Sequence, residues 1–339
     1  MMDTAPLISV CIANYNGMEV IDDCLRSVLG QQGGISVEIL VHDDASTDAS
    51  VAHIREHYPE VVLIESDTNV GFCIANNRMM TRARGKFILL LNNDAALFAD
   101  ALQTLLTEAV RLAQPAILTL PQFDATTGVL VDRGCLLDPF YNPVPNLNPN
   151  RADVAMVIGA CLWIPKTLWD ELEGFPEWFG SIAEDMYLCC RARLAGYAVR
   201  ALAASGYRHW QGKSFGGNRV QQGRLSTNVR RRYMSERNKI YTLIATYPPY
   251  ILWIALCIHL ALSLLESLLL GVIKKNYSLV RRIYFAAWKD VIHELPILLH
   301  LRKRIAKRTV ITFCKQVSVF YPIHRKIHLL FRHGIPSIR

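Results

Sequence analysis

Three short apolar runs, each ending in polar residues and followed by a helical pattern, constrain the fold most strongly. The runs are 7–13, 37–41 and 87–91, and their polar tips are 14–17, 42–48 and 92–94. A repeated strand-helix unit predicts a largely parallel sheet with right-handed crossovers. The polar tips then share one edge of the sheet, which is where open α/β folds bind their ligands.

The tip Asn92-Asn93-Asp94 places a carboxylate and two amides directly after a buried run. Oxygen ligands of this kind suit a hard cation such as Mg²⁺ or Mn²⁺ that bridges phosphates. Asn and Asp also end strands as turn formers, so the tripeptide alone leaves both interpretations open. Asp94 is expected at a solvent-facing strand tip.

Part of the polarity at the tips is expected to be helix capping. Ser46 or Thr47 is positioned to cap the helix that runs to about His57, and Asn69 or Asn76 to cap the next helix. Hydroxyl and amide oxygens at these positions accept hydrogen bonds from the first free N–H groups of a helix.

In their order and spacing, these motifs resemble the family 2, GT-A type glycosyltransferases, and within them the bacterial rhamnosyltransferase-like branch. The matching segments between residues 6 and 215 are 12–17, 41–48, 69–72, Asn76-Asn77, 90–94, Gly159-Ala160, Gly174-Phe175, Glu184-Asp185 and 191–196. The chain departs from the family pattern at Ile74-Ala75, where small glycines are usual, and at Asn92, where many relatives carry Asp. The resemblance implies an α/β fold of the GT-A kind, with a Rossmann-like, mostly parallel sheet and flanking helices.

The resemblance also implies a nucleotide-sugar donor. Asp44 is the candidate that reads a uracil or thymine base, Asp43 is the weaker candidate, and the backbone of Ala13, Asn14 and Tyr15 would pack against the ring and ribose. The other donor-binding candidates are Asn69, Gly71, Asn76, Asn93 and Lys213. A turn and capping cluster is the alternative interpretation of the aspartate pair, because Ser, Thr and Asp follow it.

Asp94 and His209 are the metal candidates. By resemblance, Asp94 would hold Mn²⁺ or Mg²⁺, which screens charge on the leaving diphosphate. His209 follows another strand-like run in Tyr207-Arg208-His209-Trp210 and is similar to the late histidine of the family. A packed, hydrogen-bonded histidine is the alternative.

Glu184 and Asp185 precede an amphipathic segment at 186–194, where acids in the first turn are also favoured by the helix dipole. The resemblance implies that Asp185 is the general base that takes the proton from the acceptor hydroxyl, with inversion at the sugar. Trp178 and Phe179, with Glu184, are the acceptor-binding candidates. Aromatic core packing is the alternative for the two rings.

Positive charge gathers in the C-terminal third of the chain. Residues 1–222 contain 16 Lys and Arg against 25 Asp and Glu, whereas residues 223–339 contain 21 against 4. Between basic flanks, residues 250–273 contain no Lys or Arg and one acid, Glu266. Apolar length beside dense positive charge predicts an anionic membrane surface as partner and disfavours nucleic acid. We expect a catalytic domain at 1–222 and a basic, apolar, helical membrane-association region at 223–339.

The apolar stretch is long enough to span a bilayer, at about 1.5 Å per residue. A single span would carry residues 274–339, with 15 Lys and Arg and 2 acids, to the side disfavoured by the positive-inside rule. We therefore expect helices that lie on or dip into the cytoplasmic face of the inner membrane. A buried core helix is the alternative. No secretory signal pattern opens the sequence, so the first domain is expected in the cytosol.

Other classes of protein fit the sequence less well. Nine cysteines without a CxxC pair are interpreted as reduced core thiols. The segment Gln211-Gly212-Lys213-Ser214 resembles the end of a P-loop, but the preceding glycine, Gly206, is one residue too far away, so an ATPase or kinase is discounted.

The resemblance predicts an inverting transferase that moves a sugar from a nucleotide diphosphate, with dTDP-rhamnose or a UDP-sugar favoured. The expected acceptor is a saccharide or lipid-linked saccharide in cell-surface polysaccharide synthesis. An inactive GT-A-like membrane scaffold remains an alternative, which Asp44, Asp94 and Asp185 together disfavour. The other alternative is a metal-dependent nucleotidyltransferase. It is disfavoured because no Gly-rich, basic loop follows the first strand.

Overall fold

A computed structural model describes residues 5–210, 219–221, 224–334 and 337–338, and it divides into two compact units. The N-terminal unit consists of Met1–Cys135, Pro145–Ser181 and Tyr197–Ser214. The C-terminal unit consists of Leu136–Val144, Ile182–Gly196 and Phe215–Arg339. The segment that carries Glu184 and Asp185 is thus grouped with the C-terminal helices. The domain boundary expected after residue 222 stays a prediction.

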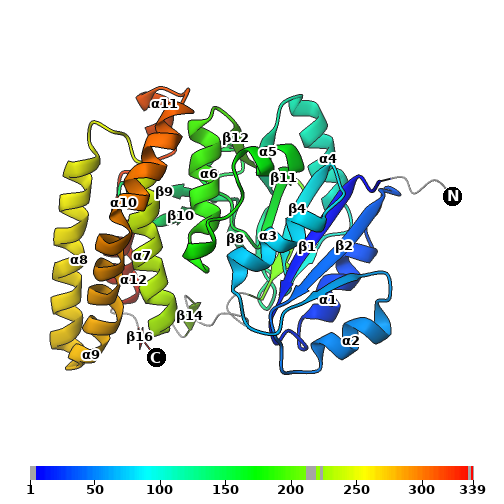
Figure 1. Cartoon of the computed structure of the whole chain (residues 1–339), viewed down its shortest axis with the longest axis horizontal. Helices are drawn as coiled ribbons and strands as arrows, with labels where there is room; N and C mark the ends of the chain where they lie inside the picture. The colour runs from blue at the N-terminus through cyan, green and yellow to red at the C-terminus, as the bar shows by residue number, and fades with distance from the viewer. Residues whose placement is uncertain (1–4, 211–218, 222–223, 335–336, 339) are drawn as a thin grey trace. The chain divides into compact units, whose positions relative to one another are not determined.

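A seven-stranded sheet forms the centre of the N-terminal unit, in the order β12-β6-β11-β4-β1-β2-β3 (Figure 1). Its strands are β1 (Ile8–Asn14), β2 (Val37–Asp43), β3 (Val62–Glu65), β4 (Phe87–Asn92), β6 (Ala116–Thr119), β11 (Cys161–Pro165) and β12 (Ala198–Ala201). All neighbouring pairs are parallel except those of β11, which runs antiparallel to β4 and β6. The expected mostly parallel α/β sheet is confirmed.

The helices of this unit are α1 (Ile21–Leu29), α2 (Ser50–His57), α3 (Phe72–Arg82), α4 (Ala101–Leu112), α5 (Lys166–Glu171) and the 3-10 helix η1 (Glu177–Phe179). Their apolar residues recur at helical spacing. In α1 the buried residues are Ile21, Cys24, Leu25 and Val28, which form one stripe along the helix. This stripe joins the apolar cluster made by the buried strands β1, β2 and β4.

The predicted helix caps are wrong. Neither α2 nor α3 has a side-chain cap, and their N-cap residues are Ala49 and Gly71. The hydroxyl of Ser46 instead donates to the Asp43 carboxylate at 2.6 Å, and the amide of Asn69 donates to the backbone oxygen of Asp44 at 3.3 Å. The strand-tip aspartates therefore take the polar groups that were expected to cap the helices.

A second sheet, in the order β5-β13-β7-β8, follows the end of β4. Its strands are β5 (Ala95–Leu97), β7 (Gln122–Asp124), β8 (Leu130–Asp132) and β13 (Tyr207–His209). His209 pairs with Ala95 across β13 and β5, which brings a late residue of the chain beside the tip of β4. A further pair is formed by β9 (Cys135–Leu137) and β10 (Pro143–Pro145).

The C-terminal unit is mainly helical, and its elements in chain order are α6 (Glu184–Leu194), β14 (Arg219–Gln221), β15 (Arg224–Thr227), α7 (Val229–Thr246), α8 (Leu252–Lys274), α9 (Tyr277–Val280), the π-helix η2 (Arg281–Phe285), α10 (Ala286–Lys307), α11 (Phe313–Val317), α12 (Arg325–His333) and β16 (Ser337–Ile338). Helix α7 packs against α10 and also contacts α6 and α8 (Figure 1). Strands β14, β15 and β16 form a small sheet.

Helix α8 contains most of the apolar stretch expected at 250–273. Among the described residues it is the one helix that is long and apolar enough to cross a membrane by length and composition. Only one third of its most apolar part is buried within the structure. A core helix usually buries more of its surface than this, and association with a membrane stays a prediction.

All nine cysteines are free thiols in the described part of the chain. Seven are buried, including the adjacent Cys189 and Cys190 in α6, whereas Cys257 and Cys314 are exposed. Burial raises the pKa of Cys190 to about 12, so this thiol stays protonated at neutral pH. The interpretation as reduced core thiols is confirmed for the seven buried cysteines.

Candidate active site

The polar tips of the central strands meet at one edge of the sheet, as the sequence predicts. In the register of the sheet, Asn14 lies opposite Asp43 and Ala13 lies opposite Asn92. The tips of β1, β2 and β4 therefore end at the same level. This is the position at which open α/β sheets hold ligands.

Asn14 ties the three tips together through a side-chain amide that is only 1% exposed. Its Nδ2 donates to Asp43 Oδ1 at 2.9 Å and to Ser50 Oγ at 3.0 Å. Its Oδ1 accepts from Asn93 Nδ2 at 2.9 Å. Because buried polar groups are costly without partners, this satisfied network fixes the geometry of the edge.

Gly17 is a site residue to which the sequence analysis gave no role. A Cβ atom at this position would lie 2.1 Å from Asn14 Oδ1 and 2.4 Å from Asn93 Nδ2. The loop after β1 can thus pass directly over the Asn14–Asn93 hydrogen bond only with glycine at position 17. The signal in the sequence was the Asn-Gly pair at the end of β1, which a turn alone also explains.

Asp44 holds the loop that leads into α3. Its Oδ1 accepts from the Val70 N–H at 2.6 Å and its Oδ2 from the Gly71 N–H at 2.9 Å. Gly71 has a φ of +88°, a conformation that favours glycine. Each carboxylate oxygen of Asp44 keeps a second lone pair, so a further N–H donor can still be accepted.

The other donor-binding candidates differ in accessibility. Tyr15 is 42% exposed beside the strand tips, whereas Asn76 is 1% exposed and donates to the Phe72 carbonyl oxygen within α3 at 2.8 Å. Lys213 lies outside the described residues. Donor contacts by these residues stay predictions.

Asp94 is buried, which corrects the expectation of a solvent-facing tip. It is 2% exposed, because the chain turns sharply from β4 into β5 and β13 pairs alongside. Its Oδ1 lies 3.0 Å from His209 Nε2. The other ring nitrogen of His209 lies 3.3 Å from Gln122 Oε1, so both nitrogens of the imidazole face oxygen atoms.

Asp94 Oδ2 is buried and has no hydrogen-bond partner among the described residues. An unpaired buried carboxylate oxygen is unfavourable by about 1–3 kcal/mol or more, so its surroundings call for a cation or a donor. Within the described residues no cluster of three or more His, Cys, Asp or Glu could hold a metal. The unpaired Oδ2 of Asp94 fits a cation whose remaining ligands are phosphate and water oxygens, as is usual for Mg²⁺, while His209 contacts the other carboxylate oxygen and its role as a ligand stays a prediction.

Asp132 is a second buried carboxyl group near His209 that the sequence analysis missed. It lies opposite Gln122 in the pairing of β7 with β8 and is 3% exposed. Burial raises the pKa of Asp132 to about 7, while its hydrogen bond from the Gly134 N–H and the charge of His209 act in the opposite direction. A single acid in a short, turn-rich segment gave no signal in the sequence.

Glu184 and Asp185 begin helix α6 in the C-terminal unit, as expected. Glu184 is 6% exposed, and its Oε2 has no hydrogen-bond partner among the described residues. Burial and then the neighbouring Asp185 raise the pKa of Glu184 to about 8, while Arg231 on α7 lowers it. Strongly perturbed acids of this kind are common at functional sites.

The turn before α6 is strained. Ile182 and Ala183 have φ values of +70° and +71°, which are unfavourable for a β-branched residue above all. The carbonyl oxygen of Ile182 accepts a hydrogen bond from the buried amide of Asn238 at 2.8 Å. Asp185 is half-buried, and its Oδ1 accepts from the Met186 N–H at 2.7 Å. Helix α7 thus supports the turn that presents the acid pair.

The two acceptor-binding aromatic candidates separate in the structure. Trp178 is 37% exposed, whereas Phe179 is fully buried and packs edge-on against Trp178 with ring centroids 4.8 Å apart. Core packing accounts for Phe179. A stacking surface for a sugar can come only from Trp178.

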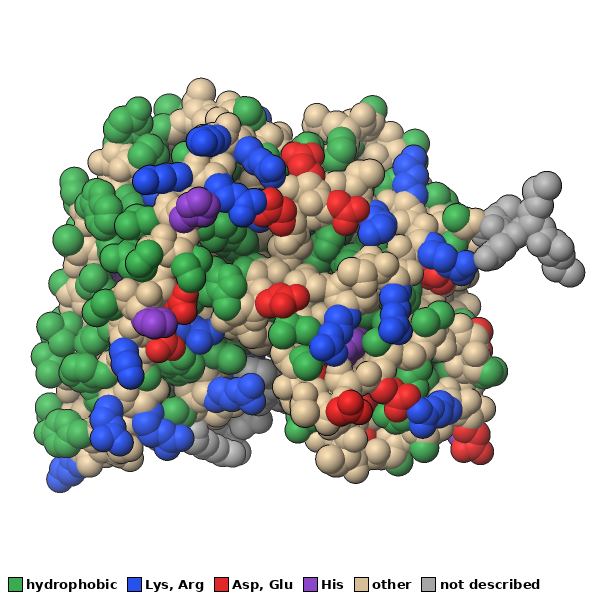
Figure 2. Space-filling model, in the orientation of Figure 1, with side chains coloured by type: hydrophobic (Ala, Val, Ile, Leu, Met, Phe, Trp, Pro, Cys, Tyr) green, Lys and Arg blue, Asp and Glu red, His purple; other side chains and the backbone are tan. Residues whose placement is uncertain are grey.

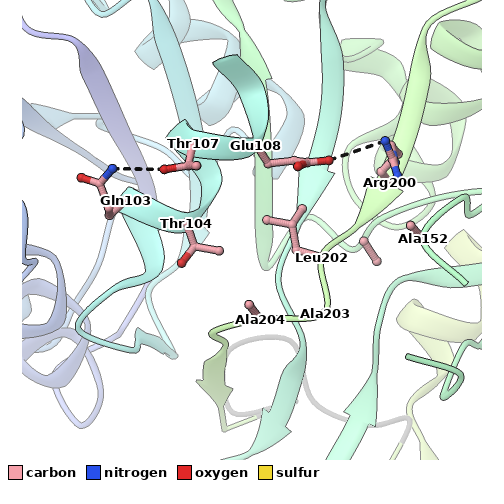
Figure 3. A pocket seen from close by; sticks show the side chains of 10 residues that line it. Gln103, Thr104, Thr107, Glu108, Ala152, Arg200, Leu202, Ala203 and Ala204 are labelled. Carbon is pink, nitrogen blue, oxygen red and sulfur yellow. Dashed lines mark hydrogen bonds and ion pairs between the residues drawn. The ribbon is translucent and has the colours of Figure 1, made fainter. Parts of the chain in front are cut away.

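A cavity of about 460 Å³ lies between α4 and the end of β12 in the N-terminal unit (Figure 3). Gln103, Thr107, Glu108 and Arg200 line it, and Glu108 and Arg200 form an ion pair at 3.5 Å (Figure 3). The sequence candidates do not line this cavity. The hydrogen bond from Arg111 lowers the pKa of Glu108, as expected for an ion-paired acid, and the cavity forms no part of the candidate site.

Comparison with known proteins agrees with this geometry. The family model described as glycosyl transferase family 2 matches residues 9–141, and the one described as glycosyl transferase family group 2 matches residues 87–290. Chondroitin synthase of Escherichia coli is 31% identical over 188 residues, which are 54% of this chain and 26% of that protein. The chain covers about a quarter to a third of the length of the curated relatives that it matches.

Two solved structures share the fold. GalNAc-T7 with UDP, GalNAc and Mn²⁺ aligns with a TM-score of 0.58 at 13% identity, over 73% of this chain and 49% of that chain. S. aureus TarS 1–349 in complex with UDP-GlcNAc aligns with a TM-score of 0.53 at 16% identity, over 89% and 88% of the two chains. At these identities the likeness shows the fold alone, which is the GT-A fold. Since the second family model covers more than half of the chain, this protein belongs to glycosyl transferase family group 2.

Proposed function

We propose that this protein is a metal-dependent, inverting glycosyltransferase of the rhamnosyltransferase-like branch. The donor is a nucleotide diphosphate sugar, with dTDP-rhamnose and UDP-sugars tested first. The acceptor is a saccharide or lipid-linked saccharide in the synthesis of a cell-surface polysaccharide. Family membership, the name of the chondroitin synthase relative and the UDP found in the GalNAc-T7 structure support this proposal.

The observation that carries the proposal is the half-paired carboxylate of Asp94. One oxygen faces His209 and the other is buried with no hydrogen-bond partner among the described residues, at the edge where three strand tips converge. A divalent cation bound there would supply charge stabilisation for the departing diphosphate. The Mn²⁺ in the GalNAc-T7 structure supports the choice of metal.

The other candidate residues have distinct roles in the proposal. Asp44 accepts the N–H of the pyrimidine base with the lone pairs left over from Val70 and Gly71. Asn14 and Asn93 keep the edge rigid, so donor binding does not have to order it. Asp185 accepts the proton of the acceptor hydroxyl as that oxygen attacks, and Trp178 stacks on the acceptor sugar.

The membrane location is part of the same proposal. The protein would work at the cytoplasmic face of the inner membrane, with residues 223–339 as the membrane-associated region. The strong excess of Lys and Arg in that region supports attraction to an anionic surface.

A donor-hydrolysis screen tests the proposal directly. Full-length protein is incubated with UDP-, dTDP- and GDP-sugars, each with Mn²⁺, with Mg²⁺ or with EDTA, and release of the nucleotide is measured. We expect release from one pyrimidine nucleotide sugar with metal and its loss in EDTA. Full turnover in EDTA would overturn the metal site, and turnover of no sugar would overturn the function.

Asp94→Asn is the sharpest single variant for this site. The amide keeps the shape of the side chain but provides a weaker ligand for a cation, so turnover should fall by about 10²-fold or more. Asp170→Asn on the surface serves as the control, since its side chain is 60% exposed. Calorimetry should show weakened Mn²⁺ binding for Asp94→Asn only, with an unchanged melting temperature within a few degrees.

A further inference from the structure

Helix α8 buries small and polar side chains and exposes large apolar ones, which is the reverse of the pattern in a helix of a soluble protein. Its buried residues include the small or polar side chains His259, Ser263, Ser267 and Gly271. Leu252, Leu256 and Leu270 are also buried, but most of its large aliphatic side chains are exposed, namely Ile254, Ile258, Leu260, Leu264, Leu265, Leu268, Leu269, Val272 and Ile273. We call these nine residues the outer face of α8. Apolar side chains gather along the edge of the molecule formed by α8 in Figure 2.

The single acid of α8 is fixed on the inward side. Glu266 Oε2 accepts from Lys326 Nζ of α12 at 2.7 Å, and its Oε1 pairs with Arg232 of α7. Glu236 of α7 lies in the same cluster, 2.7 Å from Lys326 Nζ and 3.1 Å from Lys239 Nζ. Breaking these ion pairs would leave charged side chains without their partners. Helix α8 therefore cannot rotate to turn its acid outward.

The outer face is a large apolar surface whose exposure to water is unfavourable. Val272 is 64% exposed, Ile254 63%, Leu268 57% and Leu265 54%. Exposed apolar surface of this kind costs about 25 cal/mol per Å², and contiguous patches mark surfaces that something else covers.

Charge identifies what covers the outer face. Lys274, Lys275, Arg281 and Arg282 are all exposed at the C-terminal end of α8 and in η2. At the other end, Tyr250 is 88% exposed and Trp253 57%, and such amphipathic rings prefer the headgroup level of a bilayer. Aliphatic surface bordered by cations and aromatic rings is complementary to a membrane with anionic lipids.

The neighbours of α8 exclude a simple span. At about 1.5 Å per residue its 23 residues are about 35 Å long, which is enough to cross. However, α8 packs on α7 and η2, and η2 continues directly into α10. A perpendicular arrangement would place Glu266, well inside α8, and its partners Arg232 and Lys326 at the level of the hydrocarbon layer, where ionic groups are costly.

We propose that α8 lies in the plane of an anionic membrane, with its outer face inserted in one leaflet and its inner face packed on the ionic cluster. This proposal deepens the membrane location within the proposed function and rests on it only in that respect. It depends on the C-terminal unit and not on donor chemistry, so the two can fail separately.

Vesicle sedimentation of the full-length protein tests the proposal. Phosphatidylcholine vesicles with and without 30% phosphatidylglycerol are used, since a fraction of about 0.3 gives a clear anionic surface. We expect binding to the anionic vesicles that survives a high-salt wash, because apolar insertion is not screened. Protein that stays in the supernatant would overturn the proposal.

A triple variant tests the outer face itself. Leu265→Gln, Leu268→Gln and Val272→Gln together should weaken vesicle binding at least tenfold. Donor hydrolysis in solution, and the melting temperature, report whether this variant is folded. The matched control is Val110→Gln with Val129→Gln, whose side chains are 66% and 64% exposed in the N-terminal unit and should leave vesicle binding unchanged. Equal binding by the triple variant and the wild type would overturn the assignment of the face.

Two charge variants measure the electrostatic contribution to vesicle binding. Lys274→Gln and Lys275→Gln should each weaken binding to anionic vesicles about fivefold at physiological salt and leave binding to neutral vesicles unchanged. An equal loss on both kinds of vesicle would contradict the role of anionic lipid.

Two further outcomes would replace the membrane by another arrangement. A stable dimer in lipid-free buffer that the triple variant converts to monomers would show that a second copy covers the outer face. Reporters fused to the two chain ends that locate on opposite sides of the membrane would show a span. Vesicle binding without any donor hydrolysis would leave the membrane surface standing and overturn the catalytic proposal alone.

Discussion

The two units of this protein arrange polar and apolar side chains in opposite ways. In the N-terminal unit, apolar strands form the interior, and Asn14, Asp43 and Asn93 are brought together where the strands end. In the C-terminal unit, Glu236 and Lys326 lie inside while leucines of α8 lie outside. The direction of polarity indicates the medium that each region meets. The first arrangement suits water and a polar ligand, and the second suits lipid.

The buried polar groups of the two units also differ in charge. The strand-tip network joins the neutral amides of Asn14 and Asn93 to the carboxylate of Asp43. The cluster under α8 is ionic, since Glu236 contacts Arg232, Lys239 and Lys326. A buried neutral group that loses its hydrogen bond costs about 1–3 kcal/mol, whereas breaking a buried ion pair costs about 3–5 kcal/mol.

The largest expected effect concerns catalysis by the C-terminal unit. Asp185→Asn retains hydrogen bonding but cannot accept a proton, so turnover should fall by about 10²- to 10⁴-fold. Donor affinity measured by calorimetry should change little, because the donor candidates belong to the N-terminal unit. A parallel loss of donor affinity and turnover would make Asp185 structural and would confine the chemistry to the N-terminal unit.

The second effect tests the ionic interior. Glu236→Ala removes a carboxylate that is 2% exposed and contacts Lys239, and it leaves Arg232 and Lys326 to share Glu266, so the free energy of unfolding should fall by about 3–5 kcal/mol. In the N-terminal unit, Asp170→Ala removes one partner of the exposed pair with Lys166 and should cost less than about 1 kcal/mol. Denaturant titration measures both. Equal losses in the free energy of unfolding for the two variants would contradict the difference between the two units.

The third effect tests the strand-tip network. Gly17→Ala forces a Cβ atom into the Asn14–Asn93 hydrogen bond, so the free energy of unfolding should fall by about 1–3 kcal/mol. Gly128→Ala is the control, because it has an unfavourable φ but nothing within 4 Å of the added Cβ. If Gly17→Ala were as stable as the wild type, the network would be flexible and not a rigid edge.

The last effect is a change in pH dependence, which is small over any single pH unit. The folded state raises the pKa of Glu184 from its usual 4.5 to about 8, so between these values it keeps a proton that the unfolded state has released. The stability of the wild type relative to Glu184→Gln should therefore decline as pH rises through this window, by up to about 1.4 kcal/mol per pH unit.

Comparing the two proteins is necessary because other groups titrate too. Burial lowers the pKa of His259 to about 3, which gives an opposite slope below its ordinary value. Thermal unfolding of both proteins from pH 5 to 8 measures the difference. Parallel curves for the wild type and Glu184→Gln would show that Glu184 is ionised in the folded state.

The sequence predicted the sheet well because its signal is periodic and local. Buried runs bounded by polar residues located β1, β2 and β4, and the parallel register then aligned their tips. The pairing of Asp94 with His209 joins residues 115 positions apart, and only the motif order of the family suggested it. Helix α8 was located by its composition, within a few residues of its observed bounds.

The errors share one physical cause. Ser46 and Asn69 were assigned to helix ends because capping is a local rule, but the aspartates of the strand tips compete for their donors. Burial of Asp94 depends on the pairing of β5 with β13, and the need for Gly17 depends on a contact with Asn93. Such tertiary contacts have no periodic signature in the chain. The direction in which α8 faces was equally hidden, since one acid among leucines does not reveal its partner.

The hydrogen bond between Asn14 and Asn93 has a consequence for how this sequence can vary. Position 17 must be glycine only while both amides occupy the space above it. A smaller residue at position 14 would open that space and admit alanine at 17, although each change alone is harmful. Substitutions at positions 14, 17 and 93 should therefore occur together. A protein with only one of these changes should be less fit than either the original protein or the one with the full set.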